Sequence, residues 1–426
     1  MDSELYELKS SSEEVNFEYD KIKSIDVVAY ESYCMRLINN GKLGFSATTK
    51  KNDIEFLENT SKKVSQFLED CNFNFAGAYS YNTPNIFFPD DPRFTFEREL
   101  IICKEAISKI KSSFPQIYCF AQIGKNVSNT KLSTTLGFNG DYNKTEYYYV
   151  VGGTYSEEGN FTQVFAGMAN CTGDIDFDRI NEHVLMLLKY SSKNVKVSPG
   201  KYTIIFSPYA VPDLMLPFIQ SLNGRTVEKG ISPFRDKLNK KLFDERFTLI
   251  DDGLLKDGIN TVPFDDEGTP SESVKLVENG VLNNFYLDLK SAAKLNLKPT
   301  GNGFKAKRAS QLQPQVSPSP TNWVINNGEK SINDIIKDVK EGIYVENLMG
   351  TFAGNLYSGE VSGNVSMGFK IENGEIVGRV KNTMISVNVF ESLRNSLLDI
   401  SSEREVVFGT VYPYIALSNI NLSVKA

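Results

Sequence analysis

Histidine is almost absent from this sequence, which contains one residue of that type, His183, among 426. A zinc site of the H-E-x-x-H kind requires two histidines, and Ser-His-Asp or Cys-His catalysis would each depend on this one. His183 is followed by Val184 and Leu185 in an amphipathic stretch, and no credible nucleophile stands near it in the sequence. We interpret it as a residue on a helix surface or at a domain boundary, and these catalytic classes are disfavoured.

Cysteine and long apolar runs are scarce as well. The five cysteines are odd in number, form no C-x-x-C pair and end at Cys171, so their spacing does not suit a zinc knuckle. The first residues are acidic and polar, unlike a secretion signal, and no apolar run reaches the length of about 18 residues that a membrane span needs. The sequence therefore predicts a cytoplasmic protein with reduced thiols and no membrane segment.

An excess of positive charge is also missing, because 46 Lys and Arg residues stand against 53 Asp and Glu residues, which gives a net charge of −7. Direct binding to nucleic acid needs a basic footprint, so we do not expect it. Lys305, Lys307 and Arg308 form one local cluster of positive charge. We interpret this cluster as a solvated loop.

Hydrophobic periodicity and turn signals predict an α+β fold in two domains. We expect residues 1–192 to form an N-terminal antiparallel sheet with helices, and residues 200–426 a C-terminal β-rich, barrel-like domain. The polar stretch between them ends in Pro-Gly and is typical of a linker. The clearest expected elements are helices at 53–71, 95–113, 177–190, 211–222 and 331–340, a hairpin at 33–48, and four strands between 116 and 170, whereas residues 1–30 are weakly patterned.

Two clusters of carboxylates lie close together in the sequence, Asp251-Asp252 and Asp265-Asp266-Glu267, and Gly268 follows the second. Such oxygen donors suit calcium or magnesium, and paired carboxylates can perform acid–base chemistry. Asp and Gly together also make turns, because Asp bonds its own backbone and Gly accepts positive φ. We favour structural turns, and contact with a metal or a peptide is the alternative.

Four segments between 248 and 303 occur in a distinctive order: TLIDDG, VPFDDEGTP, KLVENGVLNNFYLD and PTGNG, the last containing Gly301 and Gly303. They are followed by SINDIIKDVKEGIY at 331–344 and by a Gly-rich stretch from Tyr357 to Gly374. In order and spacing these motifs resemble the C-terminal domain of the TldD/PmbA family, long called modulators of DNA gyrase. The resemblance covers most of 200–426, and the N-terminal half fits in outline.

The resemblance implies one subunit of a cytosolic, two-subunit peptidase that degrades unfolded or flexible peptides. In that family the TldD-type subunit holds zinc through an H-E-x-x-x-H helix, which follows a buried strand, and through a Cys near the C-terminus. The corresponding helix positions fall near Met215, Leu216 and Gln220, and no Cys follows Cys171. A thioether, an alkyl group and an amide are poor replacements for imidazole on zinc.

The resemblance therefore implies the non-catalytic, TldE/PmbA-type subunit, with no catalytic residue, no metal ligand and no cofactor of its own. Zinc is expected in a TldD-type partner subunit, and this chain would contribute an interface and part of a peptide channel. We predict peptide contact at Gly354, Gly359 and Gly363, because a Gly- and Ser-rich sheet edge at 354–368 would let a peptide add as a strand.

Two other functions stay open. The first is a stand-alone regulatory or binding protein, homodimeric and acting on a partner such as a topoisomerase. The second is an enzyme that uses Asp251, Asp252, Asp265 and Asp266 with another metal. Because relatives of this family form dimers, an isolated chain that pairs with itself would fit both the first alternative and the two-subunit peptidase.

Overall fold

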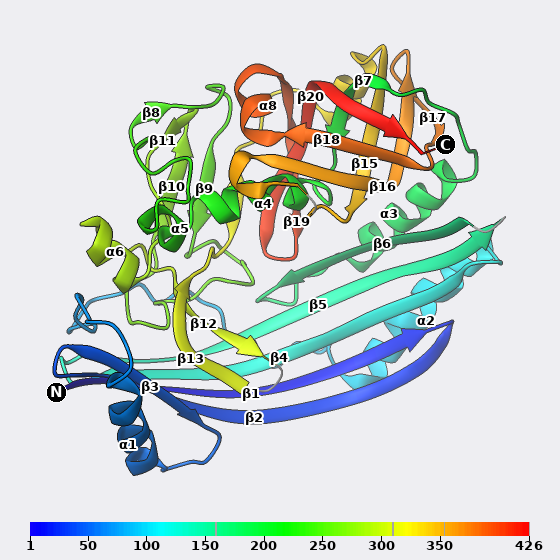
Figure 1. The fold of residues 1–426 in the computed structure, drawn as a ribbon. Coiled ribbons are helices and arrows are strands. Elements are labelled where there is room, and N and C mark those ends of the chain that lie inside the picture. The colour runs from blue at the N-terminus through cyan, green and yellow to red at the C-terminus, as the bar shows by residue number, and fades with distance from the viewer. Residues whose placement is uncertain (158–159, 309–310, 353, 426) are drawn as a thin grey trace.

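The computed structural model describes residues 1–157, 160–308, 311–352 and 354–425, which form a long N-terminal sheet with a β-rich unit above it (Figure 1). The N-terminal sheet is antiparallel, with the strand order β3-β2-β1-β4-β5-β6. Its strands are β1 Asp2–Glu18, β2 Lys21–Asn39, β3 Lys42–Thr48, β4 Tyr118–Thr134, β5 Asn139–Glu157 and β6 Asn160–Asn170.

The two ends of this sheet bury opposite faces. Near the start of β1, Tyr6 and Leu8 pack with Phe264 of the C-terminal half, whereas farther along the strand Val15 and Phe17 are buried on the other face. Strand side chains alternate in direction, so residues an odd number of positions apart must point to opposite sides. The change of buried face within one strand therefore lets the sheet serve two separate cores.

Three helices cover parts of the N-terminal sheet. They are α1 Ile54–Ser65, α2 Phe96–Ser113 and α3 Phe177–Tyr190. Thr95 and Asp176 cap α2 and α3 by accepting hydrogen bonds from backbone amides of the first turn, which explains where both helices begin. α1 packs on β2 and β3, whereas α2 and α3 share the core that contains Val15.

Five strands of the C-terminal half close into a barrel in the order β7-β15-β16-β18-β20, and β20 pairs with β7 again. The pairing of β7 with β15 is parallel, and the other four are antiparallel. Ile204, Phe206 and Ile385 are among the buried side chains of the barrel core. The barrel strands are β7 Gly200–Phe206, β15 Glu341–Met349, β16 Glu360–Glu372, β18 Thr383–Asn388 and β20 Thr410–Val424.

The barrel sheet continues beyond β20, and a separate hairpin, β12–β13, reaches down to the N-terminal sheet, where it contacts β2 and β3 (Figure 1). The remaining strands are β8 Lys240–Lys241, β9 Leu249–Asp252, β10 Ser273–Glu278, β11 Val281–Leu282, β12 Gly303–Arg308, β13 Gln311–Pro318, β14 Trp323–Ile325, β17 Glu375–Arg379 and β19 Leu397–Val407. The remaining helices are α4 Val211–Ser221, α5 Gly224–Glu228, α6 Leu289–Leu295, α7 Ile332–Lys337 and α8 Val389–Asn395, with a 3₁₀ turn at Leu356–Ser358.

The predicted α+β class and the barrel-like C-terminal half are confirmed, as are the helices expected at 95–113, 177–190 and 211–222. The helix expected at 53–71 ends at Ser65, and the one expected at 331–340 is the shorter α7. Within the part of the chain that the structure describes, no helix has the length and apolar character needed to cross a membrane.

The weak pattern of residues 1–30 conceals two long strands. β1 changes its buried face, which breaks the alternation of apolar and polar residues, and β2 is exposed on both faces over most of 21–31. The prediction of four strands between 116 and 170 is also wrong, because β4 runs without a break through the polar stretch 124–130. The sequence Glu158-Gly159-Asn160 also predicts a turn between strands, and residues 158–159 lie outside the described part of the chain.

Candidate functional site

The helix α4 follows the buried strand β7 and contains Met215, Leu216 and Gln220, near which the family resemblance predicts the positions of the zinc ligands. Val211, Leu214 and Phe218 pack into the barrel core, and Met215 is completely buried beside them. Leu216 and Gln220 lie on the partly exposed side of the helix, one turn apart. The helix geometry therefore separates Met215 from the other two side chains.

This helix does not fit a zinc ion. Zinc in proteins takes imidazole, thiolate or carboxylate donors in a roughly tetrahedral set, and the three side chains offer a thioether, an alkyl group and an amide. Asp213 is the ionisable residue of α4; burial raises the pKa of its carboxyl, which accepts a 2.8 Å hydrogen bond from Thr351 Oγ1. In the described ranges, no three His, Cys, Asp or Glu side chains converge as a metal site.

The end of β15 and the segment after it expose apolar side chains near α4. Met349 is 61%, Phe352 75% and Tyr357 39% exposed. The 3₁₀ turn Leu356–Ser358 contacts α4, and Thr351 bonds to Asp213 at the start of that helix. This arrangement places an apolar surface beside α4.

The predicted peptide-binding glycines lie in this segment or directly after it, in close contact with neighbouring atoms. Gly359 has a φ of +88°, and a Cβ there would come within 2.5 Å of the Phe390 ring. A Cβ on Gly354 would stand 2.3 Å from the carbonyl oxygen of Glu360, and one on Gly363 would stand 2.8 Å from Thr351. The three glycines therefore let the segment fold tightly against the barrel.

The prediction of a free sheet edge at 354–368 is wrong. β16 pairs with β15 on one side, and on the other side with β18 at its start and β17 at its end. Its first residues also face Phe352, which bridges to Ser362. β16 therefore offers a peptide no continuous free edge, because residues 360–364 are already paired with β18 and residues 369–372 with β17.

The first acidic cluster is a buried hydrogen-bonding centre. Asp251, on β9, accepts hydrogen bonds from the backbone nitrogen and Oγ1 of Thr321, at 2.7 and 2.8 Å, and from Asn302. Burial raises the pKa of Asp251 to about 6. Asp252 lies next to it on the strand and accepts a 3.1 Å hydrogen bond from the amide of Leu254. The cluster thus fixes the backbone around β9.

The second cluster forms a turn whose carboxylates accept hydrogen bonds from several segments of the chain. Asp265 accepts hydrogen bonds from the amides of Glu267 (3.0 Å), Thr269 (2.9 Å) and Gly303 (2.8 Å). Gly268 and Gly301 have φ values of +81° and +71°, which glycine adopts without strain. Because these carboxylate oxygens are occupied by backbone donors, they tie the turn to the β12–β13 hairpin.

A buried network of charges links this turn to the N-terminal sheet. Arg36 of β2 bonds to Glu4 of β1 (Nε to Oε1, 2.9 Å) and to Glu267 (2.6 Å), and Lys305 of β12 bonds to Glu4 (3.0 Å). All four side chains are at most 3% exposed. Lys305 also donates to the backbone oxygen of Asp266 at 2.7 Å. We call these four residues, Glu4, Arg36, Glu267 and Lys305, the seam network.

The interpretation of the basic cluster as a solvated loop is wrong for Lys305. Its amine is buried over the ring of Tyr6, 4.4 Å from the centroid, and its charge pairs with Glu4 of the N-terminal sheet. The side chains of Lys307 and Arg308 lie outside the described part of the structure. Sequence reasoning missed this role because Glu4, the acidic partner of Lys305, stands 301 residues away in the chain.

His183 lies on α3, where that helix meets β15 of the barrel. Its Nε2 is 2.7 Å from Oε1 of Glu346, and its ring stacks on Tyr209. Tyr344 donates a 3.0 Å hydrogen bond to the other oxygen of Glu346, which is completely buried. Burial disfavours the charged imidazole, but Glu346 outweighs this effect and raises the pKa of His183.

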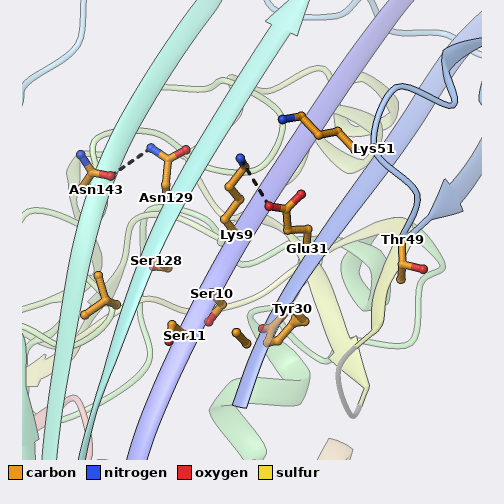
Figure 2. Close-up of a pocket in the computed structure, with 12 residues that line it drawn as sticks. Lys9, Ser10, Ser11, Tyr30, Glu31, Thr49, Lys51, Ser128, Asn129 and Asn143 are labelled. Atoms are coloured by element: carbon orange, nitrogen blue, oxygen red, sulfur yellow. Dashed lines mark hydrogen bonds and ion pairs between the residues drawn. The ribbon is translucent and has the colours of Figure 1, made fainter. Parts of the chain in front are cut away.

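A surface hollow of about 660 Å³ lies on the N-terminal sheet, which sequence reasoning did not find (Figure 2). Glu31, Lys9, Asn129 and Asn143 stand side by side in it, on four adjacent strands. Lys9 is 3.4 Å from Glu31, and Asn129 donates a 3.0 Å hydrogen bond to Asn143. The row offers polar contacts but no catalytic group.

Two family models and several curated proteins match this chain. A family model described as the PmbA/TldA metallopeptidase C-terminal domain matches residues 199–424, and a model of PmbA/TldA metallopeptidase domain 1 matches residues 3–64. An uncharacterised protein of Methanocaldococcus jannaschii is 26% identical, over 93% of this chain and 91% of its own length. The chain spans only about half the length of the curated metalloproteases that it matches.

Two solved structures share the fold over nearly the whole chain. One is a protein of Thermotoga maritima described as a modulator of DNA gyrase, with a TM-score of 0.89, 21% identity, and coverage of 99% of this chain and 96% of that chain. The other is TldE from Thermococcus kodakarensis, with a TM-score of 0.87, 20% identity and the same coverage.

Proposed function

The chain belongs to the PmbA/TldA metallopeptidase family, and from this premise we propose that it is a non-catalytic, TldE-like subunit of a two-subunit zinc peptidase. The substrate would be an unfolded or flexible peptide, and the zinc would be held by a TldD-type partner subunit. The fold shared with TldE of Thermococcus kodakarensis supports this proposal.

One observation carries the proposal: the set of residues on α4. Met215 is enclosed in the barrel core, and Leu216 and Gln220 lack a donor group that zinc prefers. The chain also has a single histidine, and it is engaged with Glu346 on another element. The positions that the resemblance assigns to zinc ligands are therefore held here by one core residue and two side chains without a zinc donor.

The contribution of this chain would then be to bind the peptide and complete the channel. Met349, Phe352 and Tyr357 form the exposed apolar surface beside α4, which suits the apolar side chains of an unfolded peptide. We keep Gly354, Gly359 and Gly363 as part of this proposed surface, because they determine its shape.

Reconstitution tests the proposal. The chain is purified together with a family member that retains H-E-x-x-x-H and a late Cys, and hydrolysis of an unstructured peptide is measured with and without a chelator. We expect the pair to cleave the peptide, the chelator to stop it, and Phe352→Ala to lower turnover roughly tenfold without changing the zinc content.

Phe67→Ala is the matched control, because Phe67 is 85% exposed in the N-terminal domain, away from α4, and should leave turnover unchanged. If the family member with the intact motif is fully active alone, or if Phe352→Ala and Phe67→Ala behave alike, the proposed role in peptide binding is wrong.

A further inference from the structure

A cleft of about 830 Å³ lies where α5, α6 and β13 face the end of the N-terminal sheet that carries β3. Figure 1 shows α5 and α6 above this end of the sheet. Leu43 and Phe45 of β3 form the floor of the cleft, α5 and α6 form one wall, which we call the helix wall, and residues 67–73 form another, which we call the strap. The volume lies in the range of about 300–1,000 Å³ that is typical of ligand pockets.

Two ion pairs hold α5 and α6 together in the helix wall. Arg225 of α5 donates a 3.0 Å hydrogen bond to Asp288, the buried residue that caps α6. Lys294 of α6 lies 2.5 Å from Glu228 of α5. Because these four charges compensate one another, the charge that the helix wall offers to a ligand comes from its other residues.

Two further lysines of the helix wall are available to a ligand. Lys229 is exposed at the end of α5 and makes no ion pair with any residue that the structure describes. Lys290 of α6 lies 3.8 Å from Glu69 of the strap, whose side chain is 81% exposed. An exposed ion pair contributes little free energy, so a ligand can replace it at little cost. The helix wall therefore presents two ammonium groups.

The strap presents charge of the opposite sign. Glu69 and Asp70 both line the cleft and are exposed. In the described ranges, the side chain of Asp70 has no hydrogen bond and no ion pair. The backbone amide of Cys71 donates a 2.6 Å hydrogen bond to the carbonyl oxygen of Gly41, which holds the strap against the start of β3. Two carboxylates are therefore fixed on a different wall from the two lysines.

The floor and the strap also bring apolar side chains to the cleft. Leu43 and Phe45 are partly exposed, and they stand two residues apart on β3, so their side chains point to the same face of the strand. Leu68 and Phe73 of the strap are partly exposed as well, and Phe67 is 85% exposed. Apolar groups gathered in a cleft favour a ligand with apolar surface of its own.

The charges and the apolar surface together define the chemistry of the ligand. An anion would leave the two carboxylates of the strap without a partner, and a cation would leave the two lysines without one. A zwitterion with an apolar body complements both walls and covers the floor. A short peptide with free ends has this composition, because it carries an ammonium group at one end, a carboxylate at the other and side chains between them.

We propose that this cleft binds a short peptide of apolar residues with both termini free. The peptide carboxylate lies at Lys229 and Lys290, and its side chains cover the floor. Its ammonium group lies at Glu69 and Asp70. Among the described residues that line the cleft, none belongs to α4 or to the apolar surface beside α4. The site therefore goes beyond the proposed peptidase role and does not depend on it.

Isothermal titration calorimetry of the full chain with trileucine tests the chemistry of the ligand. We expect trileucine to bind, and N-acetyl-trileucine and trileucine amide each to bind roughly tenfold more weakly, because each lacks one terminal charge. Triglycine, which has no apolar side chains, should bind more weakly than trileucine. Equal affinity for trileucine and for the peptide blocked at both ends would contradict the proposal, as would the absence of trileucine binding at millimolar concentration.

Paired substitutions test the position of the peptide. Lys229→Met/Lys290→Met should weaken trileucine binding roughly tenfold but leave the binding of trileucine amide unchanged, because the amide has no carboxylate to lose. Glu69→Gln/Asp70→Asn should in turn weaken trileucine binding and leave the binding of N-acetyl-trileucine unchanged. A purely structural role of these residues would weaken the binding of all the peptides alike, and that result would overturn the proposal.

Lys104→Met and Glu105→Gln, at exposed positions on α2, are the matched controls and should not change trileucine binding. Circular dichroism checks that each variant is folded. Phe352→Ala should also leave trileucine binding unchanged. Loss of binding in Phe352→Ala together with full binding in Lys229→Met/Lys290→Met would put the peptide beside α4 and contradict the proposal.

Discussion

The two ends of β1 bury acidic side chains in opposite ways. Where β1 meets the C-terminal half, Glu4 is enclosed with Arg36 and Lys305 as partners. Where the sheet meets α2, Glu99 is 1% exposed, and no hydrogen-bond partner is found for either carboxylate oxygen among the described residues. Burial works against ionisation of both, but the two cations lower the pKa of Glu4, whereas the pKa of Glu99 rises to about 7.

The contact between the N-terminal sheet and the C-terminal half is therefore charged, whereas the core beneath α2 is neutral. Removing one partner of a buried ion pair strongly destabilises the fold, because the other charge stays buried without compensation. A buried acid without partners instead keeps its proton and remains neutral. The seam network therefore joins the N-terminal sheet to the C-terminal half through charge, and the core beneath α2 favours the protonated form of Glu99.

The largest effect is expected from Arg36→Met. Glu4 and Glu267 would stay buried without their cation, which should lower the free energy of unfolding by about 3–5 kcal/mol. Denaturant unfolding, followed by the fluorescence of the single, buried Trp323, measures it. Arg98→Met, at an exposed position on α2, is the control and should change stability by less than about 0.5 kcal/mol. Equal effects of the two variants would refute the role of the seam network.

Glu99→Gln should raise the free energy of unfolding, whereas Arg36→Met lowers it. The folded-state pKa of Glu99 is raised from its ordinary 4.5 to about 7, so the contribution of Glu99 to stability is complete below about pH 4.5 and is lost as pH rises through about 7. The neutral variant should match the wild type at about pH 4 and exceed it by on the order of 3 kcal/mol at about pH 9. Thermal denaturation across pH checks this, with exposed Glu97→Gln as control; parallel profiles for wild type and Glu99→Gln would contradict it.

Gly303→Ala probes the seam network from its backbone. A Cβ at this position would stand 2.4 Å from Oε2 of Glu267 and displace the carboxylate that holds Arg36. We expect a loss of roughly 1–3 kcal/mol, as for other overpacked sites. Gly200→Ala serves for comparison, since its Cβ would meet no atom closer than 3.6 Å. A stability loss no larger than that of Gly200→Ala would show that the turn can yield.

The smallest effect is expected at the second contact between the halves, where His183 meets Glu346. The pKa of His183 is raised, so its stabilisation is complete below about pH 6.5 and is lost as pH rises through the folded-state pKa. His183→Gln should cost roughly 1 kcal/mol at about pH 5 and less at about pH 9. Comparison with the wild type at each pH removes the contribution of Glu99; a pH-independent difference would refute the ion pair.

Local signals predicted the helices well, since α2 and α3 have clear caps and amphipathic faces. The same reasoning failed at β1 and β2, because one changes its buried face and the other buries neither face over most of 21–31. The hairpin turn between β1 and β2 is Tyr19-Asp20. Both residues have positive φ, but neither is a glycine, so the sequence gives no turn signal there. Strand patterns are readable only where one face stays buried.

The parts of the site that depend on residue type could be predicted from the sequence. The parts that depend on contacts between residues far apart in the chain could not. The sequence of α4 alone shows that this helix lacks zinc donors. The seam network could not be found, because Glu4, Arg36 and Glu267 come from three separate parts of the sequence. The pairing of β16 on both sides likewise depends on long-range strand order that local turn signals do not contain.

The side chains of α4 in this chain do not offer the donors that a catalytic zinc ion needs. The most direct measurement is the zinc content of the isolated, folded chain after dialysis against trace zinc, together with its hydrolysis of an unstructured peptide. We predict less than stoichiometric zinc by a wide margin and no cleavage. One tightly held zinc per chain, lost on substitution of α4 residues and required for cleavage without a companion, would contradict the account.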